Sequence, residues 1–445
     1  IIGAFKADLV LAFRWMNILA FVATIFISGW LFLRYTKNPI FGIMTSALMC
    51  VFPFMVIMFS STYSEPVFIF LVIAGGVLVF EYLRTEKDLF LYLCTLVMAF
   101  VPLTRYIGVS ILFSTSLFIL LFTRGSIQDR IWRTTRFGII ASIPILLWLY
   151  HSYGLPGSTI GRWSINPDMG DISVKFQEFR GLFMDAICRW LPDQFQPMIN
   201  SLLYNSRYII LGIGVLAFAG ISVFANHHSR QITNPKRSDS GFLILSYFGI
   251  STITFLLFLI ISYLFSYPSV VIDNRMLLPF YVLSVMCLLG GIAFWQSTWL
   301  QEKFPWLQTF SLFLVMLYAY WIIPETIEPV EYYHAGIGLT ASQWRSSETI
   351  LAVNSLPDDQ PVICNNWELL QLWTGRPVIG LWNTNPGNPD QPLFCKKGAA
   401  LVLFSDFQEQ FETLNERENL AKLINMTGGL PVIGIYPDGN IYLCR

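Results

Sequence analysis

Charged residues are scarce in this 445-residue chain. Asp, Glu, Lys and Arg together make up 13% of it, whereas a soluble domain carries about 25%. The 28 basic and 28 acidic side chains cancel, so the net charge gives no reason to expect a nucleic-acid partner. The composition therefore argues against a wholly soluble protein.

Motifs that bind nucleotides or metal ions are also missing. The sequence contains no P-loop, no Gly-x-Gly-x-x-Gly, no Gly-x-Ser-x-Gly and no His-Glu-x-x-His. Only four histidines occur, and two of them, His227 and His228, are neighbours in a predicted loop. These absences argue against an ATP-driven machine and against a metal centre built from histidines.

Long apolar runs are what the chain has instead. Hydrophobic residues make up 55% of it, and runs of 18 or more residues are long enough to cross a hydrocarbon core of about 30 Å. The sequence predicts a polytopic α-helical membrane protein with about ten spans: Leu9–Leu33, Pro39–Phe59, Pro66–Leu83, Leu89–Leu103, Ile107–Phe122, Phe137–Tyr153, Tyr208–Ala225, Phe242–Phe265, Met276–Trp295 and Trp306–Ile323. The fourth and fifth are short and indicate a helical hairpin.

Lys and Arg are concentrated in alternate loops, which predicts the orientation. One set of loops carries Arg34, Lys37, Arg84, Lys87, Arg124, Arg130, Arg133, Arg136, Arg230, Lys236, Arg237 and Lys303. The short loops of the opposite set hold little besides Arg105 and Arg275. We therefore expect the first set to face the cytoplasm of a plasma (inner) membrane, with both ends of this chain and the loop 154–207 on the extracytoplasmic side.

The composition changes after Ile323, so we expect a transmembrane domain over residues 1–323 and a small extracytoplasmic α/β domain over residues 324–445. The pattern predicts helices at Ser346–Ser355, Glu368–Trp373 and Phe407–Met426, and strands at Pro361–Cys364, Ala399–Phe404, Val432–Tyr436 and Ile441–Cys444. The last two strands form a hairpin in which Asp438-Gly439 supplies a positive φ.

Three cysteines of the C-terminal domain, Cys364, Cys395 and Cys444, are candidates for a disulfide. The sequence does not choose among the pairings, and a domain without a bridge remains an equal alternative.

Ionisable side chains at membrane depth are costly and commonly mark a function. Glu65, Arg105 with Tyr106, and Asp273 with Arg275 fall at outer span boundaries. Two arginines on the outer side run against the positive-inside rule, and the planar guanidinium suits a phosphate or diphosphate. We expect a phosphate-binding site.

Two interpretations stay open for several of these side chains. In the alternative interpretation they are interface anchors and helix caps. Glu65 fits this interpretation because it stands directly before Pro66, in what would be the first turn of a helix. Arg162, in the long outer loop, either covers the site or anchors the loop.

Three short motifs carry a resemblance to a known family. They are Ser64-Glu65-Pro66, Leu103-Thr104-Arg105 and Asp273-Asn274-Arg275-Met276-Leu277-Leu278-Pro279. In their order and predicted membrane side the chain resembles the GT-C superfamily of membrane glycosyltransferases. It is most similar to the bacterial protein mannosyltransferase-like and aminoarabinose transferase-like group.

The resemblance implies an enzyme of the cell envelope that moves a sugar from a polyprenyl-phosphate carrier to an acceptor on the outer face. The family's catalytic acid lies in the first outer loop, which by the resemblance precedes Ile1, so that the full chain has eleven spans and no catalytic residue is assigned here. A divalent metal ion is an optional cofactor, with Glu65 as its candidate ligand.

A second class of function stays open. The chain is a non-catalytic membrane subunit in that alternative, and it holds lipid or partner proteins within a larger complex. A transporter is less favoured because the sequence shows no repeated halves.

Overall fold

The computed structural model describes residues 9–60, 63–153, 164–165, 172–188, 190, 239–267, 272–297, 306, 310, 313–323, 342–380, 398–404 and 430–444. The chain forms two compact units. One is Arg14–Val330, and the other is Glu331–Arg445 together with Ile1–Phe13.

The first unit is helical, and its described helices overlap the predicted apolar spans, apart from the helix Ile172–Cys188. They are α1 Leu9–Thr36, α2 Pro39–Val51, α3 Pro53–Ser60, α4 Glu65–Thr85, α5 Asp88–Thr104, α6 Gly108–Phe122, α7 Ile127–Tyr153, α9 Ile172–Cys188, α12 Asp239–Phe265 and α13 Asn274–Ser297, followed by an unlabelled helix at Phe313–Ile323. Two short antiparallel strands, β1 Ser164–Ile165 and β2 Ser266–Tyr267, pair with each other. The predicted span Tyr208–Ala225 lies outside the described residues.

Within the described ranges, four helices are long and apolar enough to cross a membrane, which indicates a multi-pass membrane protein. They are Ala12–Thr36, Glu65–Thr85, Gly241–Phe265 and Asn274–Phe294. The pair α2 and α3 makes a fifth if it is one span bent by 66°. The bend follows from Pro53, because the residue before a proline avoids helical geometry, and Phe52 is extended with ψ 117.

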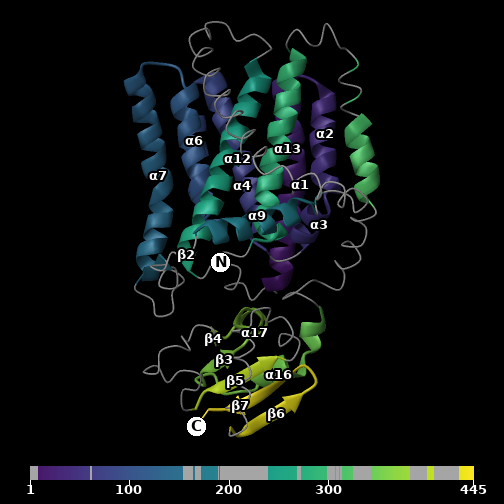
Figure 1. Ribbon diagram of the computed structural model, residues 1–445. Coiled ribbons are helices and arrows are strands. Elements are labelled where there is room, and N and C mark those ends of the chain that lie inside the picture. The colour runs from purple at the N-terminus through teal and green to yellow at the C-terminus, as the bar shows by residue number, and fades with distance from the viewer. Residues whose placement is uncertain are drawn as a thin grey trace. The chain divides into compact units, whose positions relative to one another are not determined.

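The helices pack as a bundle in which α12 lies along α13, α4 along α5, and α6 against both α7 and α12 (Figure 1). Glycines allow the closest of these contacts. A Cβ on Gly290 would lie 2.8 Å from the backbone nitrogen of Leu245, and one on Gly241 would lie 2.7 Å from that of Phe294. At each of these two positions one of the helices carries a glycine, so the backbones of α12 and α13 approach closely there.

Contacts at both ends of α1 and α4 give the direction of these helices. Asn17 Nδ2 donates to the carbonyl oxygen of Tyr63 at 3.1 Å, near the start of α4. Arg34 contacts Glu81 near the end of α4. Thus α1 and α4 run parallel. We call the end of the bundle with Arg34 and Glu81 the basic end, and the opposite end the Glu65 end.

The second unit holds a five-stranded sheet. Its elements are the 3-10 turn η3 Ser342–Ser346, α16 Glu348–Asn354, β3 Val362–Cys364, α17 Trp367–Thr374, β4 Val378–Gly380, β5 Ala400–Phe404, β6 Val432–Tyr436 and β7 Gly439–Leu443. The strand order is β4-β3-β5-β7-β6; β3 is parallel to both β4 and β5, while β7 is antiparallel to β5 and β6 (Figure 1). The predicted strands and the first two predicted helices are confirmed. Strand β4 was not predicted, and the predicted helix Phe407–Met426 lies outside the described residues.

Strand β5 is buried on both faces of this sheet. One face packs with α16 and α17 in an apolar cluster. The cluster comprises Trp344, Ile350, Val353, Val362, Cys364, Leu369, Leu370, Ala400, Val402, Phe404 and Ile441. The opposite face buries Ile363, Ala399, Leu401, Leu403 and Cys444. A strand buried on both sides reads as a continuous apolar run, which is why Ala-Leu-Val-Leu-Phe was recognisable.

The hairpin turn differs from its prediction. Tyr436 pairs with Gly439, so the two-residue loop is Pro437-Asp438, and neither Asp438 nor Gly439 has a positive φ. Gly439 is needed for another reason, because a Cβ there would lie 2.7 Å from the carbonyl oxygen of Leu403. The Asp438 carboxylate accepts a hydrogen bond from Thr349 Oγ1 at 2.6 Å and joins the turn to α16.

The three candidate cysteines have different fates. Cys364 is a free thiol, which excludes it from the disulfide, and burial raises its pKa to about 12. Cys444 is disulfide-bonded. Cys395 lies outside the described residues.

Candidate functional site

Glu65 lies at the centre of a cluster of charged side chains at the Glu65 end of the bundle. Its side chain is fully buried, and its Oε1 accepts a hydrogen bond from Arg105 Nη1 at 2.6 Å. The same oxygen accepts from Arg275 Nε. The structure therefore brings together three residues that are 40 to 210 positions apart in the sequence, which we call the Glu65 cluster.

Local features of three segments place these side chains. Glu65 is the first residue of α4 and follows Ser64. Pro66 comes next, in the first turn of the helix, where proline is favoured. Arg105 ends α5 with an extended backbone. The next helix can start against the last turn of α5 because Gly108 has no Cβ; one there would lie 2.8 Å from the backbone of Val101.

Asp273 caps the first turn of α13 and so positions Arg275. Its Oδ1 accepts the Met276 backbone N–H at 2.8 Å, and its carbonyl oxygen accepts that of Leu277 at 3.1 Å. This is the geometry of an N-cap aspartate. Of the two predicted roles of Asp273, the structure shows the cap.

Glu65 makes different contacts from those of a capping residue. The helix has no side-chain cap bond at Ser64, and the Glu65 carboxylate is directed to guanidinium groups rather than to the first N–H groups of α4. Ser64 Oγ contacts its second oxygen at 3.5 Å. A carboxylate enclosed between two arginines serves mainly to orient and partly neutralise them.

The two arginines differ in access to the surroundings. The Arg105 side chain is 12% exposed, whereas that of Arg275 is 42% exposed. The Arg275 guanidinium also lies 4.4 Å from the centroid of the Tyr63 ring, within range of a cation–π interaction. Arg105 reaches Met276 Sδ with its other Nη. Arg275 is therefore the member of the cluster that can meet a ligand directly.

The hydrogen-bond donors of the cluster suit an anion. Glu65 and, from the start of α13, Asp273 both interact electrostatically with Arg105 and Arg275, so the four charges balance, but each guanidinium has more N–H donors than Glu65 can accept. A divalent cation beside Glu65 would face both guanidinium groups at hydrogen-bond distance, so this donor set does not fit a metal ion. Among the described residues, no group of three His, Cys, Asp or Glu side chains is placed to hold one.

The remaining predicted site residues lie apart from these contacts. The Tyr106 hydroxyl accepts a hydrogen bond from Trp148 Nε1 at 3.1 Å, which links the turn after α5 to α7. Arg162 lies outside the described residues.

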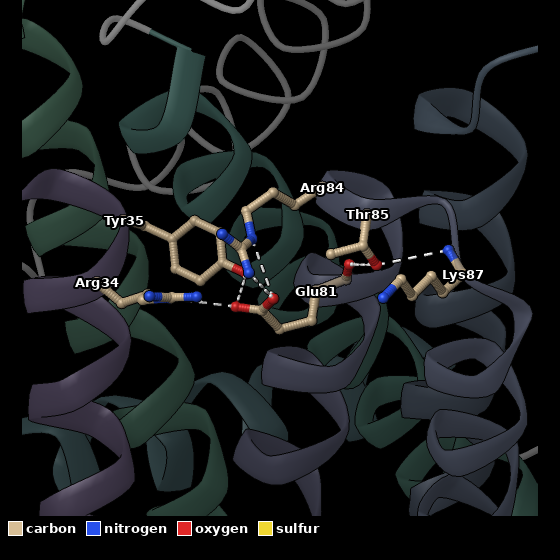
Figure 2. A network of polar contacts seen from close by, with 6 residues as sticks. All are labelled: Arg34, Tyr35, Glu81, Arg84, Thr85 and Lys87. Atoms are coloured by element: carbon tan, nitrogen blue, oxygen red, sulfur yellow. Dashed lines mark hydrogen bonds and ion pairs between the residues drawn. The ribbon is translucent and has the colours of Figure 1, made fainter.

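A second buried glutamate was missed by the sequence analysis. Glu81 lies near the other end of α4, where its carboxylate meets Arg34, Tyr35 and Arg84 (Figure 2). The signal was present in the sequence as a lone acid in an apolar run with an arginine three positions later. The contact with Arg34, 47 positions away, is not local and could not be recognised from the sequence.

Comparisons with other proteins give no further identification of this site. No protein-family model matches the chain, and no curated protein matches it.

Proposed function

We propose that this protein is a membrane glycosyltransferase of the GT-C kind, which moves a sugar from a polyprenyl-phosphate carrier to an acceptor on the outer face of the membrane. The observation that carries the proposal is the Glu65 cluster, in which one buried carboxylate holds Arg105 and Arg275 at one end of an apolar bundle. The reaction type comes from the resemblance of the three motifs around these residues.

The chemistry of the transfer requires stabilisation of the departing phosphate. As the bond between the sugar and the phosphate oxygen breaks, negative charge develops on that oxygen, and preorganised cationic donors lower the barrier. Arg275 is exposed enough to contact the phosphate. Arg105 lies behind it, and Glu65 fixes the orientation of both guanidinium groups. The carboxylate that activates the acceptor hydroxyl is assigned to no residue of this sequence.

The proposal includes a membrane arrangement. We infer ten crossings in this sequence, in which α5 and α6 form a hairpin whose arms of 17 and 15 residues reach about 25 Å and 22 Å. The basic end faces the cytoplasm of the plasma (inner) membrane, because arginines of several loops meet there, and the Glu65 end faces outward together with the C-terminal unit.

A transfer assay with the purified full-length protein tests the proposal. The substrates are a panel of polyprenyl-phosphate sugars, and the measurement is label moved to an acceptor fraction. Arg275→Gln should lower turnover at least about tenfold, which corresponds to about 1.4 kcal/mol in the barrier. Arg124→Gln is the matched control, because Arg124 also pairs with a glutamate but lies at the basic end; its turnover should stay within about twofold of the unmutated protein.

Two results would contradict the enzyme. Equal turnover of Arg275→Gln and the unmutated protein would remove the cluster from the reaction. Binding of polyprenyl phosphate without transfer from any donor would favour the alternative, a subunit that holds lipid or partner proteins.

A further inference from the structure

The cluster around Glu81 presents positive charge at the basic end of the bundle (Figure 2). Glu81 Oε1 accepts from Arg34 Nε at 3.4 Å and from the Tyr35 hydroxyl at 3.1 Å, while Oε2 accepts from Arg84 Nε at 3.0 Å and Nη2 at 2.5 Å. The glutamate is buried, whereas the side chains of Arg34 and Arg84 are 43% and 49% exposed. The negative charge is thus enclosed and the two positive charges face the surroundings.

Both arginines keep donors for a further acceptor. Among the hydrogen bonds of the described residues, Arg34 reaches Glu81 through Nε alone, and Arg84 does so through Nε and Nη2. The two Nη groups of Arg34 and Nη1 of Arg84 remain. Since two guanidinium groups outweigh one carboxylate, the cluster has one excess positive charge.

The cluster lies where a lipid headgroup would be. Arg34 and Arg84 are in the last turns of α1 and α4, two of the candidate spans. Glu81 is 16 residues after Glu65 on α4, about 24 Å along a helix axis, which approaches the thickness of a hydrocarbon core. The Arg34 guanidinium lies 5.8 Å from the centroid of the Trp30 ring, and tryptophan is enriched at membrane interfaces.

We infer that Arg34 and Arg84, held in place by Glu81, bind the phosphate of an anionic phospholipid. Guanidinium groups match phosphate oxygens with paired hydrogen bonds. A lipid with one net negative charge, such as phosphatidylglycerol, neutralises the excess charge of the cluster. A zwitterionic lipid also carries a positively charged ammonium group. That group would find no carboxylate to pair with, because Glu81 is enclosed between the two arginines. This site is separate from the Glu65 cluster and does not depend on the proposed function.

Native mass spectrometry of the full-length protein, released from nanodiscs with mixed phosphatidylglycerol and phosphatidylcholine, tests the inference. The unmutated protein should retain phosphatidylglycerol in preference to phosphatidylcholine. Arg34→Gln and Arg84→Gln should each weaken this retention about tenfold, the effect of losing one charge-assisted hydrogen bond. The control is Arg124→Gln, since Arg124 is half-exposed at the same end and pairs with half-exposed Glu86 at 2.9 Å; it should change retention less than about twofold.

Other outcomes would overturn the inference. An equal loss in Arg124→Gln would show a general attraction to the basic surface, and unchanged retention in Arg34→Gln and Arg84→Gln would show an ion-pair cluster without a ligand. Displacement of phosphatidylglycerol by excess inorganic phosphate would identify a site for free phosphate. If the Gln variants do not fold, Arg34→Lys and Arg84→Lys keep the charge opposite Glu81, and their loss of the planar fork should still weaken retention about threefold.

Discussion

Glu65 and Glu86 lie at opposite ends of α4, and each accepts a hydrogen bond from arginine, but their surroundings differ. Glu65 is fully buried between Arg105 and Arg275. Glu86 follows the helix in a left-handed conformation, with φ 56, and both it and its partner Arg124 are half-exposed. Breaking a buried ion pair leaves an uncompensated charge, whereas an exposed pair exchanges its partner for water.

We therefore expect Glu65→Gln to destabilise the folded protein by about 3 kcal/mol, and Glu86→Gln by less than about 1 kcal/mol. Both changes replace a carboxylate by an amide of the same shape. The measurement is denaturant unfolding in detergent, followed by tryptophan fluorescence. Equal, small effects of the two changes would mean that Arg105 and Arg275 do not depend on Glu65. Because the instability of Glu65→Gln would itself lower turnover, the transfer assay uses Arg275→Gln instead.

Helix packing in the bundle depends on which side of each helix is free of side chains. Gly290 and Gly291 are neighbours on α13, yet only Gly290 faces the backbone of α12. A Cβ at Gly290 would lie 2.8 Å from both the Leu245 nitrogen and Ile244 Cγ2, whereas one at Gly291 would meet only Leu245 Cδ1, at 3.5 Å. A Cβ at position 290 would therefore force the two helices apart, whereas a Cβ at position 291 would make an ordinary van der Waals contact.

Gly290→Ala should consequently destabilise the bundle by about 1–3 kcal/mol, the usual effect of overpacking. Gly291→Ala should be neutral or stabilise by up to about 1 kcal/mol, because alanine favours the helix over glycine. Thermal unfolding of both variants in the same detergent measures the difference. A Gly291→Ala variant that is the less stable of the two would contradict the close approach of α12 and α13 at Gly290.

At the scale of the whole molecule, basic residues from separate loops lie together at one end of the bundle. Arg34 and Arg84 share Glu81, and Arg124 pairs with Glu86 directly after α4. The residues from these alternate loops thus meet at one end of the bundle. Two further arginines, Arg105 and Arg275, meet at the opposite end around Glu65.

We expect a membrane-impermeant maleimide to label Asp358→Cys in intact cells and to leave Gln128→Cys unlabelled until the membrane is opened. Asp358 is fully exposed in the C-terminal unit, and Gln128 is exposed at the start of α7 near the basic end. The unmutated protein gives the background from its own thiols. Labelling of Gln128→Cys in intact cells would reverse the orientation.

The recognisable parts of the fold are those determined by local pattern. Apolar runs located α1, α4, α12 and α13 because a membrane helix must satisfy its backbone internally and expose apolar side chains. Strand β4, with the sequence Val-Ile-Gly, is as short as β3 but was missed because it ends in Gly380, which favours a turn over a strand. The hairpin prediction was right about β6 and β7 and wrong about its turn. Glycine is required at position 439 because of the close approach of the Leu403 backbone, a residue far from it in sequence, and not because of the turn.

The sequence by itself determined the apolar helices, the alternation of basic loops and four of the five strands of the C-terminal sheet, all of which depend on neighbouring residues. Only the tertiary structure decided that Glu65 holds Arg105 and Arg275 rather than capping α4, and that Glu81 joins Arg34 to Arg84. The role of a buried carboxylate depends on the charged groups that contact it, and here these groups come from helices that are distant in the sequence.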